Sequence, residues 1–384
     1  MRDAVIVAAV RTPVGKRNGA LSGVHPVDLS AHVLNALAER AGLADPAAVD
    51  DVIWGCVSQV GEQTFDIARS AVLAAGWPQS VPGVTVDRQC GSSQQSVHFA
   101  AAGLISGQYD LVVAGGVESM SRVPMGSSLG PGHPNPSGSG LETVYGGVAP
   151  NQGTGAEMVA ERWGQTRTQL DEFSLSSHAK AAGAIDEGRF AAQITPVKLE
   201  DGTVVDTDEG VRRGGTLEGL AKIKPAFRPD GVIHAGNSSQ ISDGAAALLM
   251  TTSDRARELG LTPVARIHTA VLAANDPVIM LTAPIPATRK ALDKSGLSLG
   301  DIGAYEVNEA FAPVPLAWLA DLGADPAKLN PNGGAIALGH PLGGSGARLM
   351  TTLVHHMRDN GIRYGLQTMC EGGGQANATI LELL

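Results

Sequence analysis

The chain repeats its own order of helices, turns and strands. Residues 51–53 match residues 301–303, 250 positions on, and residues 91–112 match residues 344–365, 253 positions on. Two stretches repeated at nearly the same offset predict two similar halves, because a duplicated supersecondary pattern preserves element order. Chance similarity between helix and turn signals is the alternative explanation.

Each half has the alternation typical of α/β proteins. Short apolar runs bounded by glycine or acid predict strands, and they fall at residues 52–54, 84–86 and 111–114. Segments with helical spacing lie between or after them, at residues 34–41, 94–105 and 171–184. With 384 residues the chain exceeds the usual size of one domain. We therefore expect an α/β fold with more than one packed unit.

The middle of the chain differs from both halves in its composition and in its pattern of predicted elements. Residues 121–240 contain a polar helix and an acidic turn, with little of the strand pattern seen elsewhere. This composition predicts an inserted loop domain that binds substrate. The expected division is an N-terminal half formed by residues 1–120 together with 241–265, the insertion at 121–240, and a C-terminal half at 266–384.

Composition excludes several classes of function. The net charge is −10, and no stripe of Lys or Arg could follow a phosphate backbone, so nucleic acid is not expected as a partner. The apolar run at residues 4–10 is too short to span a membrane. Three cysteines are too few for a disulfide framework, which favours a reducing cytoplasm and free thiols.

Cys90 stands between the predicted strand at residues 84–86 and a predicted helix. Its sulfur would lie near unpaired N–H groups at the positive end of that helix. A helix terminus contributes about 0.3–1 kcal/mol, whereas lowering a pKa by one unit takes about 1.4 kcal/mol. The helix alone cannot activate the thiol, so we expect a base from elsewhere. A cysteine that merely packs at the helix start is the alternative.

His340 is the candidate base. It lies in the glycine-rich segment 332–346 and is followed by a proline, which predicts a tight loop that projects the imidazole into open space. The pair His355 and His356 is expected on a solvated helix face. No further ligand follows that pair at the spacing of a zinc site, so no metal is expected.

Cys370 and Asn308 each follow or close a predicted strand. Cys370 precedes three glycines, residues 372–374, whose accessible N–H groups suit an oxyanion hole. Asn308 follows the predicted strand near Tyr305. Its amide either holds a water or caps the next helix.

These motifs resemble the thiolase family along essentially the whole chain. The matches are the turn around Cys90, residues 308–312, residues 333–341 and residues 370–374. The resemblance implies an α/β fold of duplicated doubly wound halves in five α-β-α-β-α layers, with a loop domain inserted in the first half. It also implies a homotetramer or homodimer.

The resemblance implies a role for each matched residue. Cys90 is then the nucleophile that carries the acyl group, His340 the base that activates it, and Cys370 a second acid/base. Asn308 would hold a water that forms one oxyanion hole together with His340. The backbone N–H groups of Cys90 and Gly372 would form the other.

The reaction implied is coenzyme A-dependent thiolytic cleavage of a 3-oxoacyl-CoA to acetyl-CoA and a shortened acyl-CoA, or the reverse Claisen condensation. Coenzyme A is then a co-substrate, and no permanently bound cofactor is expected. Arg212 and Ser239 match positions that contact coenzyme A in the family's loop domain. A solvated arginine without a ligand is the alternative for Arg212.

Three departures from the family pattern bear on the substrate. The nucleophile turn has Ser92-Ser93 where the family usually has Ser-Gly, residues 151–153 replace the His-Met-Gly of short-chain biosynthetic members, and Gly219 replaces a serine. These changes favour degradation of a longer or bulkier 3-oxoacyl-CoA, with steroid-derived and branched acyl groups left open.

Several other functions are alternatives to this one. An acetyl-CoA acetyltransferase that forms acetoacetyl-CoA is the nearest. A decarboxylating ketoacyl synthase would need a histidine at Asn308 and would lack the thiol of Cys370. A dinucleotide-binding protein is disfavoured because no Gly-x-Gly-x-x-Gly follows a strand. Retention of both thiols and His340 argues against an inert scaffold.

Overall fold

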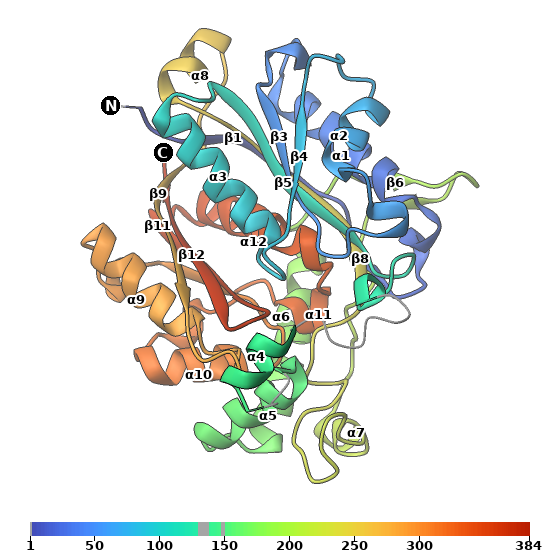
Figure 1. Cartoon of the computed structure of the whole chain (residues 1–384), viewed down its shortest axis with the longest axis vertical. Helices are drawn as coiled ribbons and strands as arrows, with labels where there is room; N and C mark the ends of the chain where they lie inside the picture. Colours follow the sequence, from blue (N-terminus) through green and yellow to red (C-terminus); the bar gives the residue numbers. More distant parts are fainter. Residues whose placement is uncertain (1, 130–137, 147–149) are drawn as a thin grey trace.

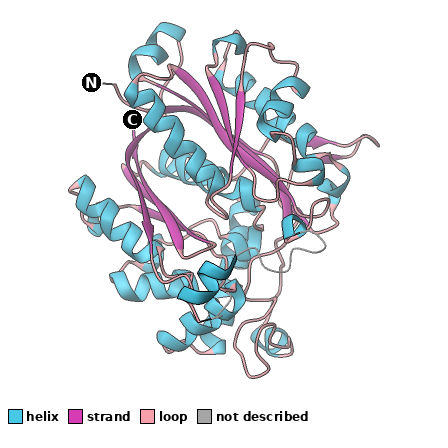
Figure 2. Ribbon diagram, viewed as in Figure 1, coloured by secondary structure: helices cyan, strands magenta, loops and turns pink. Residues whose placement is uncertain are grey.

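The computed structural model describes residues 2–129, 138–146 and 150–384, and it is drawn in Figures 1 and 2. The strands are β1 (Val5–Arg11), β2 (Gly15–Lys16), β3 (Asp51–Gly55), β4 (Gly83–Val86), β5 (Leu111–Ser119), β6 (Val197–Lys198), β7 (Val204–Val205), β8 (Ser242–Thr251), β9 (Ala265–Ala274), β10 (Ala304–Val307), β11 (Tyr364–Glu371) and β12 (Gln375–Leu383). The α-helices are α1 (Pro26–Ala41), α2 (Ile67–Ala74), α3 (Ser92–Ser106), α4 (Gly138–Val144), α5 (Gln152–Arg162), α6 (Arg167–Asp186), α7 (Leu217–Ala221), α8 (Ser253–Leu259), α9 (Pro284–Ser295), α10 (Pro313–Leu322), α11 (Ala335–Leu338) and α12 (Leu342–Asn360).

The main strands form two half-sheets that meet at a short junction. Their order is β10-β11-β12-β9-β1-β8-β5-β3-β4, with β2 paired to β8. In the described part of the sheet, the two half-sheets meet where β1 and β9 pair, through Val5 with Arg266 and Ile6 with Ala265. Strands β6 and β7 form a separate hairpin.

The two half-sheets have the same internal order and directions. In the first, β3 runs parallel to β5, and β8 and then β1 follow antiparallel. In the second, β10 runs parallel to β11, and β12 and then β9 follow antiparallel. The element order thus repeats in space as the sequence offsets predicted.

Helices cover both faces of each half-sheet. Helices α1 and α2 pack on the outer face of the first half-sheet, and α9 and α10 lie on the outer side of the second. Helices α3 and α12 pack against each other, and α12 contacts strands of both half-sheets. The predicted five-layer α-β-α-β-α arrangement is therefore confirmed, with α3 and α12 as the central layer (Figure 1).

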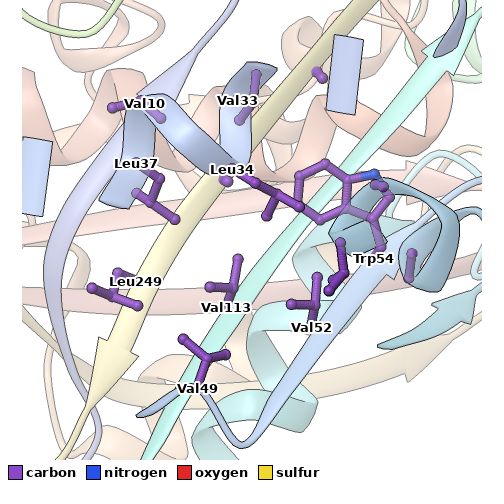
Figure 3. Close-up of a cluster of buried hydrophobic side chains, with 14 of the residues drawn as sticks. Val10, Val33, Leu34, Leu37, Val49, Val52, Trp54, Val113 and Leu249 are labelled. Atoms are coloured by element: carbon purple, nitrogen blue, oxygen red, sulfur yellow. The ribbon is translucent and has the colours of Figure 1, made fainter. Parts of the chain in front are cut away.

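Strand residues alternate between two buried layers. Val52 and Trp54 face the cluster under α1 and α2, which Figure 3 shows around Leu34 and Leu37. Ile53, between them, faces the cluster under α3 and α12. A strand covered on both faces needs apolar residues at nearly every position, which explains the continuous apolar runs in the sequence.

Helix ends are set where the sequence indicated them. Gly42 ends α1 with φ 68° and Gly107 ends α3 with φ 84°, backbone conformations that glycine adopts without strain.

The expectation that His355 lies on a solvated helix face was wrong. Its side chain is buried against β1, where Nε2 lies 3.1 Å from the carbonyl oxygen of Ala9, because α12 is covered on both sides and has little solvated face.

The chain between β5 and β8 packs back onto both halves. Helix α6 contacts α11, and α5 contacts α10. The Arg11 guanidinium of β1 binds both carboxylate oxygens of Asp208 in this segment, at 2.7 and 2.9 Å.

In the part of the chain that the structure describes, no helix is long and apolar enough to cross a membrane.

Candidate active site

The sequence-predicted residues come from loops and strand ends of both halves. Cys90 lies between β4 and α3, and Asn308 directly follows β10. Cys370 is the penultimate residue of β11, and His340 lies between α11 and α12. In α/β folds, ligands bind beyond the carboxyl ends of parallel strands, and this is the edge where β4, β10 and β11 end.

The turn that holds Cys90 is tightly hydrogen-bonded. Gln89, just before the nucleophile candidate, has φ 48°, an uncommon conformation for a residue with a side chain. Its N–H donates to Asp87 Oδ1 at 2.7 Å, and its carbonyl oxygen accepts from Ser92 Oγ at 2.6 Å. These bonds fix the direction in which the Cys90 side chain leaves the turn.

Both thiols are buried and mutually close. Cys90 is 4% exposed, and burial, followed by the charge of Glu371, raises its pKa to about 12. Burial, followed by the proximity of Cys90, raises the pKa of Cys370. The N-terminus of α3 does not offset this rise in the pKa of Cys90, because a helix terminus contributes less energy than one pKa unit requires. Both thiols are protonated at neutral pH, so a base must take the proton from either one.

Gly91, directly after Cys90, and Gly372, two positions after Cys370, lie where the two halves meet. A Cβ on Gly91 would lie 2.0 Å from Glu371 Oε1, and a Cβ on Gly372 would lie 2.8 Å from Gln89 Oε1. Neither position has room for a side chain. The backbone of Gly372 therefore lies directly beside the nucleophile turn.

His340 is buried, so the expectation that it projects into open space was wrong. It is 3% exposed. The surrounding glycines serve close packing: a Cβ on Gly343 would lie 2.5 Å from the Val117 carbonyl oxygen, and one on Gly346 would lie 2.2 Å from the Gln94 nitrogen. The loop thus presses against β5 and α3 of the first half.

The hydrogen bonds of His340 select one tautomer. Ser345 Oγ donates to the Pro341 carbonyl at 2.8 Å, so it accepts from His340 Nδ1, 2.6 Å away. Nε2 then carries the lone pair. Burial, followed by the charge of Arg348, lowers the pKa of His340 to about 3. The imidazole is neutral and able to accept a proton at Nε2.

Asn308 lies beside His340 and caps no helix. Its Nδ2 is 3.4 Å from His340 Nε2, and its Oδ1 is buried without a partner. The next helix, α10, begins only at Pro313. A buried amide oxygen without a protein partner suits a bound water.

Sequence reasoning missed Glu118 and Ser345. Buried Glu118 accepts hydrogen bonds from the N–H groups of Val57 and Ser58 and from Gly343 N, at 2.8–3.0 Å. It therefore connects a loop of the first half to the start of α12. Ser345 carried a signal, since a serine in the first turn after His340-Pro341 can reach back to the imidazole.

An apolar cavity of about 640 Å³ opens next to the two segments that carry the thiols. Gln89, Gly372 and Gly373 line its end nearest Cys90. Its walls include Met125, Leu141, Phe227, Met280 and Phe311. Met280 has φ 60°, a strained conformation of the kind found at binding sites. No sequence signal pointed to Met280.

Arg212 and Ser239 lie outside the residues that line this cavity. Arg212 is exposed, and its N–H donates to His178 Nδ1 at 3.1 Å. Ser239 is half-buried, and its N–H donates to the Ala310 carbonyl at 2.9 Å, next to the Asn308 loop. Among the described residues, no group of three or more His, Cys, Asp or Glu could hold a metal ion.

Comparisons with known proteins place these motifs in one family. Residues 4–254 match the family described as "Thiolase, N-terminal domain" and residues 261–383 match "Thiolase, C-terminal domain". The steroid 3-ketoacyl-CoA thiolase FadA6 of Mycobacterium tuberculosis is 51% identical over 390 residues, covering 100% of this chain and 95% of that protein. A 3-ketoacyl-CoA thiolase of Pseudoalteromonas translucida is 46% identical over 391 residues, covering 100% and 99%. The crystal structure of the Bacillus anthracis acetyl-CoA acetyltransferase superposes with a TM-score of 0.91 at 40% identity, covering 100% and 99%.

Proposed function

The chain belongs to the thiolase family, and on that premise we propose that it cleaves a 3-oxoacyl-CoA with coenzyme A into acetyl-CoA and a shortened acyl-CoA. The observation that carries the proposal is the pair of buried thiols, Cys90 and Cys370, whose near neighbours in sequence, Gln89 and Gly372, line an apolar cavity. Thiolysis moves protons at two different centres, a carbon and a sulfur, so it uses two acid/base groups.

In the first half-reaction, His340 Nε2 takes the proton of Cys90 Sγ as the sulfur bonds to the 3-oxo carbon. The carbonyl electron pair moves to oxygen, and the backbone N–H groups of Cys90 and Gly372 stabilise that oxyanion. The bond between carbons 2 and 3 then breaks, and its electron pair is delocalised onto the thioester oxygen, which a water held by Asn308 stabilises together with the protonated His340. Cys370 gives its proton to the departing carbon, which releases acetyl-CoA and leaves the acyl group on Cys90.

In the second half-reaction, the Cys370 thiolate takes the proton of incoming coenzyme A. The new thiolate attacks the acyl carbon, and the oxyanion forms on the same oxygen as before, where the backbone N–H groups of Cys90 and Gly372 stabilise it again. Cys90 leaves as its sulfur regains a proton from His340. Each acid/base group thus returns to its starting state, and the reverse sequence is a Claisen condensation.

The test is to map acyl transfer onto the cysteines. The protein is incubated with 3-oxoacyl-CoA esters without free coenzyme A, and the labelled peptide is found by mass spectrometry. We expect label on Cys90 in the wild type and in Cys56→Ala, the matched control for a buried cysteine outside the cavity, and none in Cys90→Ser. Label on Cys370 or Cys56 alone would contradict the assignment.

We also propose an acyl group longer or bulkier than acetoacetyl, which includes steroid-derived groups. Support comes from the apolar walls of the cavity. The relative from Mycobacterium tuberculosis is named a steroid 3-ketoacyl-CoA thiolase. A panel of esters should give a higher kcat/KM for bulky acyl groups than for acetoacetyl-CoA. The reverse order would remove this part of the proposal.

We assign coenzyme A contacts to Arg212 and Ser239. Arg212 is exposed in the inserted segment and could bind the anionic end of coenzyme A, and Ser239 lies next to residues 308–312. Arg212→Ala should raise the KM for coenzyme A several-fold at unchanged kcat. Arg213→Ala is the neighbouring control, because Arg213 already pairs with Asp186. An equal effect of both variants would argue against the assignment.

We propose that the chain divides into residues 1–120 with 241–265, the loop domain 121–240, and residues 266–384, and that it assembles as a homodimer or homotetramer. Strand β4 ends the sheet with a free edge, and Val84 is 43% exposed there. Phe99 of α3, which packs on β4, is 47% exposed. An uncovered edge with apolar neighbours favours pairing with a second copy.

Light scattering tests the assembly. The wild type should have the mass of two or four chains, and Val84→Lys should shift it toward one. A monomeric wild type would exclude this proposal. A cytoplasmic location is part of the same proposal, because the reaction uses two reduced thiols and the three cysteines are free.

A further inference from the structure

Glu118 of β5 is a fully buried carboxylate that binds four hydrogen-bond donors. Its Oε1 accepts from Ser58 N at 3.0 Å and from Gln63 Nε2 at 2.8 Å. Its Oε2 accepts from Val57 N at 3.0 Å and from Gly343 N at 2.8 Å. Burial raises the pKa of Glu118, and these donors oppose that rise. A proton on the carboxyl would displace one of the four, so the ionised form fits this set of partners.

One of the four donors, Gly343 N, belongs to the first turn of α12. The N-cap residue of α12 is Pro341, which provides no side-chain cap, and the first turn contains no acidic residue. N–H groups in the first turn have no partner within their own helix, and a negative charge near them is favourable. Glu118 therefore acts as the acidic cap of α12, supplied by a strand residue 225 positions earlier in the sequence.

The same turn of α12 holds the ring of His340. His340 Nδ1 donates to Ser345 Oγ at 2.6 Å, and Ser345 Oγ donates to the Pro341 carbonyl at 2.8 Å. The backbone N–H of His340 is bound elsewhere, by Ser242 Oγ at 3.1 Å, at the start of β8. Since the ring is held by α12 and the backbone by β8, the direction of the imidazole depends on where α12 begins.

The charge of Glu118 also acts on Cys90, but in the opposite sense. Burial is the main cause of the raised pKa of Cys90, followed by the charge of Glu371, and the charge of Glu118 adds to both. Removing that charge would by itself make the thiolate easier to form. An electrostatic role and a positioning role of Glu118 therefore predict opposite changes in the reactivity of Cys90.

We propose that Glu118 is a positioning residue for His340. By binding Gly343 N it fixes the start of α12, and through Ser345 this start directs Nε2 of the imidazole toward the thiol of Cys90. Its other three hydrogen bonds anchor the carboxylate to the segment that follows β3. The base is thus aligned on the half of the molecule that carries the nucleophile. The inference rests on the proposed function for the identity of the base.

The test is the rate at which iodoacetamide alkylates Cys90 at pH 8, followed by peptide mass spectrometry. The thiol, with a pKa of about 12, is protonated at this pH, so the reaction depends on the base. Glu118→Gln keeps the size of the side chain but turns an amide N–H₂ toward N–H donors, which should shift the start of α12. The rate should fall at least about 10-fold, because a misplacement of about 1 Å can cost about 100-fold. His340→Ala gives the rate without the base.

Asp3→Asn is the matched control. Asp3 Oδ1 accepts from Ser253 N at 2.8 Å, at the first residue of α8. Asp3 precedes β1, at the edge of the sheet opposite the one where β4 ends. Both variants weaken an acidic helix cap and should lower Tm. In thiolysis, only Glu118→Gln should lower kcat, with KM changed by less than about two-fold, because Glu118 does not line the cavity.

Alkylation needs no turnover, so it separates this inference from the proposed function. Slow alkylation in Glu118→Gln together with failed acyl mapping would remove the proposed function and leave the placement of His340 standing. Faster alkylation would mean that Glu118 acts through its charge, and an unchanged rate at a lowered Tm would make it a helix cap alone. Either result overturns the inference.

A second variant covers the case in which Glu118→Gln does not fold. Glu118→Asp keeps the charge but is one carbon too short to bind both Gly343 N and the segment that follows β3. It should also slow the alkylation of Cys90. A wild-type rate in Glu118→Asp overturns the inference.

Discussion

Two fully buried arginines lie in the interior, one on β1 and one on α12, and they differ in their hydrogen-bond partners. Arg11 donates two hydrogen bonds to Asp208, one to Gln193 Oε1 and one to the Thr12 carbonyl, and its guanidinium lies 4.9 Å from the centre of the Phe190 ring. Arg348 has no protein partner at any nitrogen.

The difference separates a buried charge that is paired from one that has no hydrogen-bond partner among the described residues. Asp208 and Gln193 both belong to the chain between β5 and β8, so the Arg11 pairing holds that segment onto the first strand. A buried pair with good geometry is destabilising chiefly when it is broken. Among the described residues, Arg348 makes no hydrogen bond to another segment.

The largest expected effect on stability comes from neutralising Asp208, the partner of Arg11. Asp208→Asn leaves the Arg11 charge uncompensated in the interior, which should lower the free energy of unfolding by about 3–5 kcal/mol. Urea unfolding followed by circular dichroism measures it. Asp206→Asn, two positions earlier and exposed, should change the value by less than about 0.5 kcal/mol. Equal losses in the two variants would erase the contrast between the arginines.

A smaller, pH-dependent effect on stability is expected from Glu306, the largest opposing charge on Arg348. Burial raises the pKa of Glu306 to about 8 from its ordinary 4.5, so between these values the folded protein holds a proton that the unfolded chain has released. Stability from this group is present at low pH and is lost as pH rises toward 8. Glu306→Gln should flatten the stability profile by at most about 1.4 kcal/mol per pH unit.

Urea unfolding at pH 5, 6, 7 and 8 measures this slope. Exposed Glu200→Gln should keep the slope of the wild type. A slope in Glu306→Gln as steep as in the wild type would mean that Arg348 and Glu306 form an ordinary ion pair, like Arg11 and Asp208.

The smallest effect concerns the ring beside Arg11. Phe190→Leu keeps most of the apolar volume and removes the face on which the guanidinium lies, so it should cost about 1 kcal/mol. The urea midpoint should fall at unchanged m-value. A neutral result would show that the Asp208 pairing alone holds Arg11.

Much of the fold follows from local sequence signals. The apolar runs around Ile53 and Val112 predict buried strands because both faces of each half-sheet are covered, and Gly42 and Gly107 mark helix ends through their left-handed backbone. The repeat offsets predict the duplicated order because both half-sheets use the same strand directions. Each of these signals depends on residues within one element or on equal spacing.

The environment of the site could not be predicted in the same way. The burial of His340 depends on Val117 and Gln94, which are more than 200 positions away in sequence and press against its glycines. The unpartnered state of Arg348 and Glu306 depends on how α12 packs on β10, which lie far apart in sequence. Burial and gaps of this kind arise only when both halves are packed, so a motif can mark the residue without revealing its surroundings.

The position of β8 also determines when the first half can fold during synthesis. Strand β8 lies between β1 and β5, yet Ser242 is made 123 residues after Ser119, the end of β5. At about 5–20 residues per second, the ribosome needs roughly 6–25 s to supply it. Throughout that interval β1 and β5 lack the central strand that joins them. Nascent chains should therefore carry exposed apolar strands for many seconds, and their yield should depend on chaperones that bind such strands.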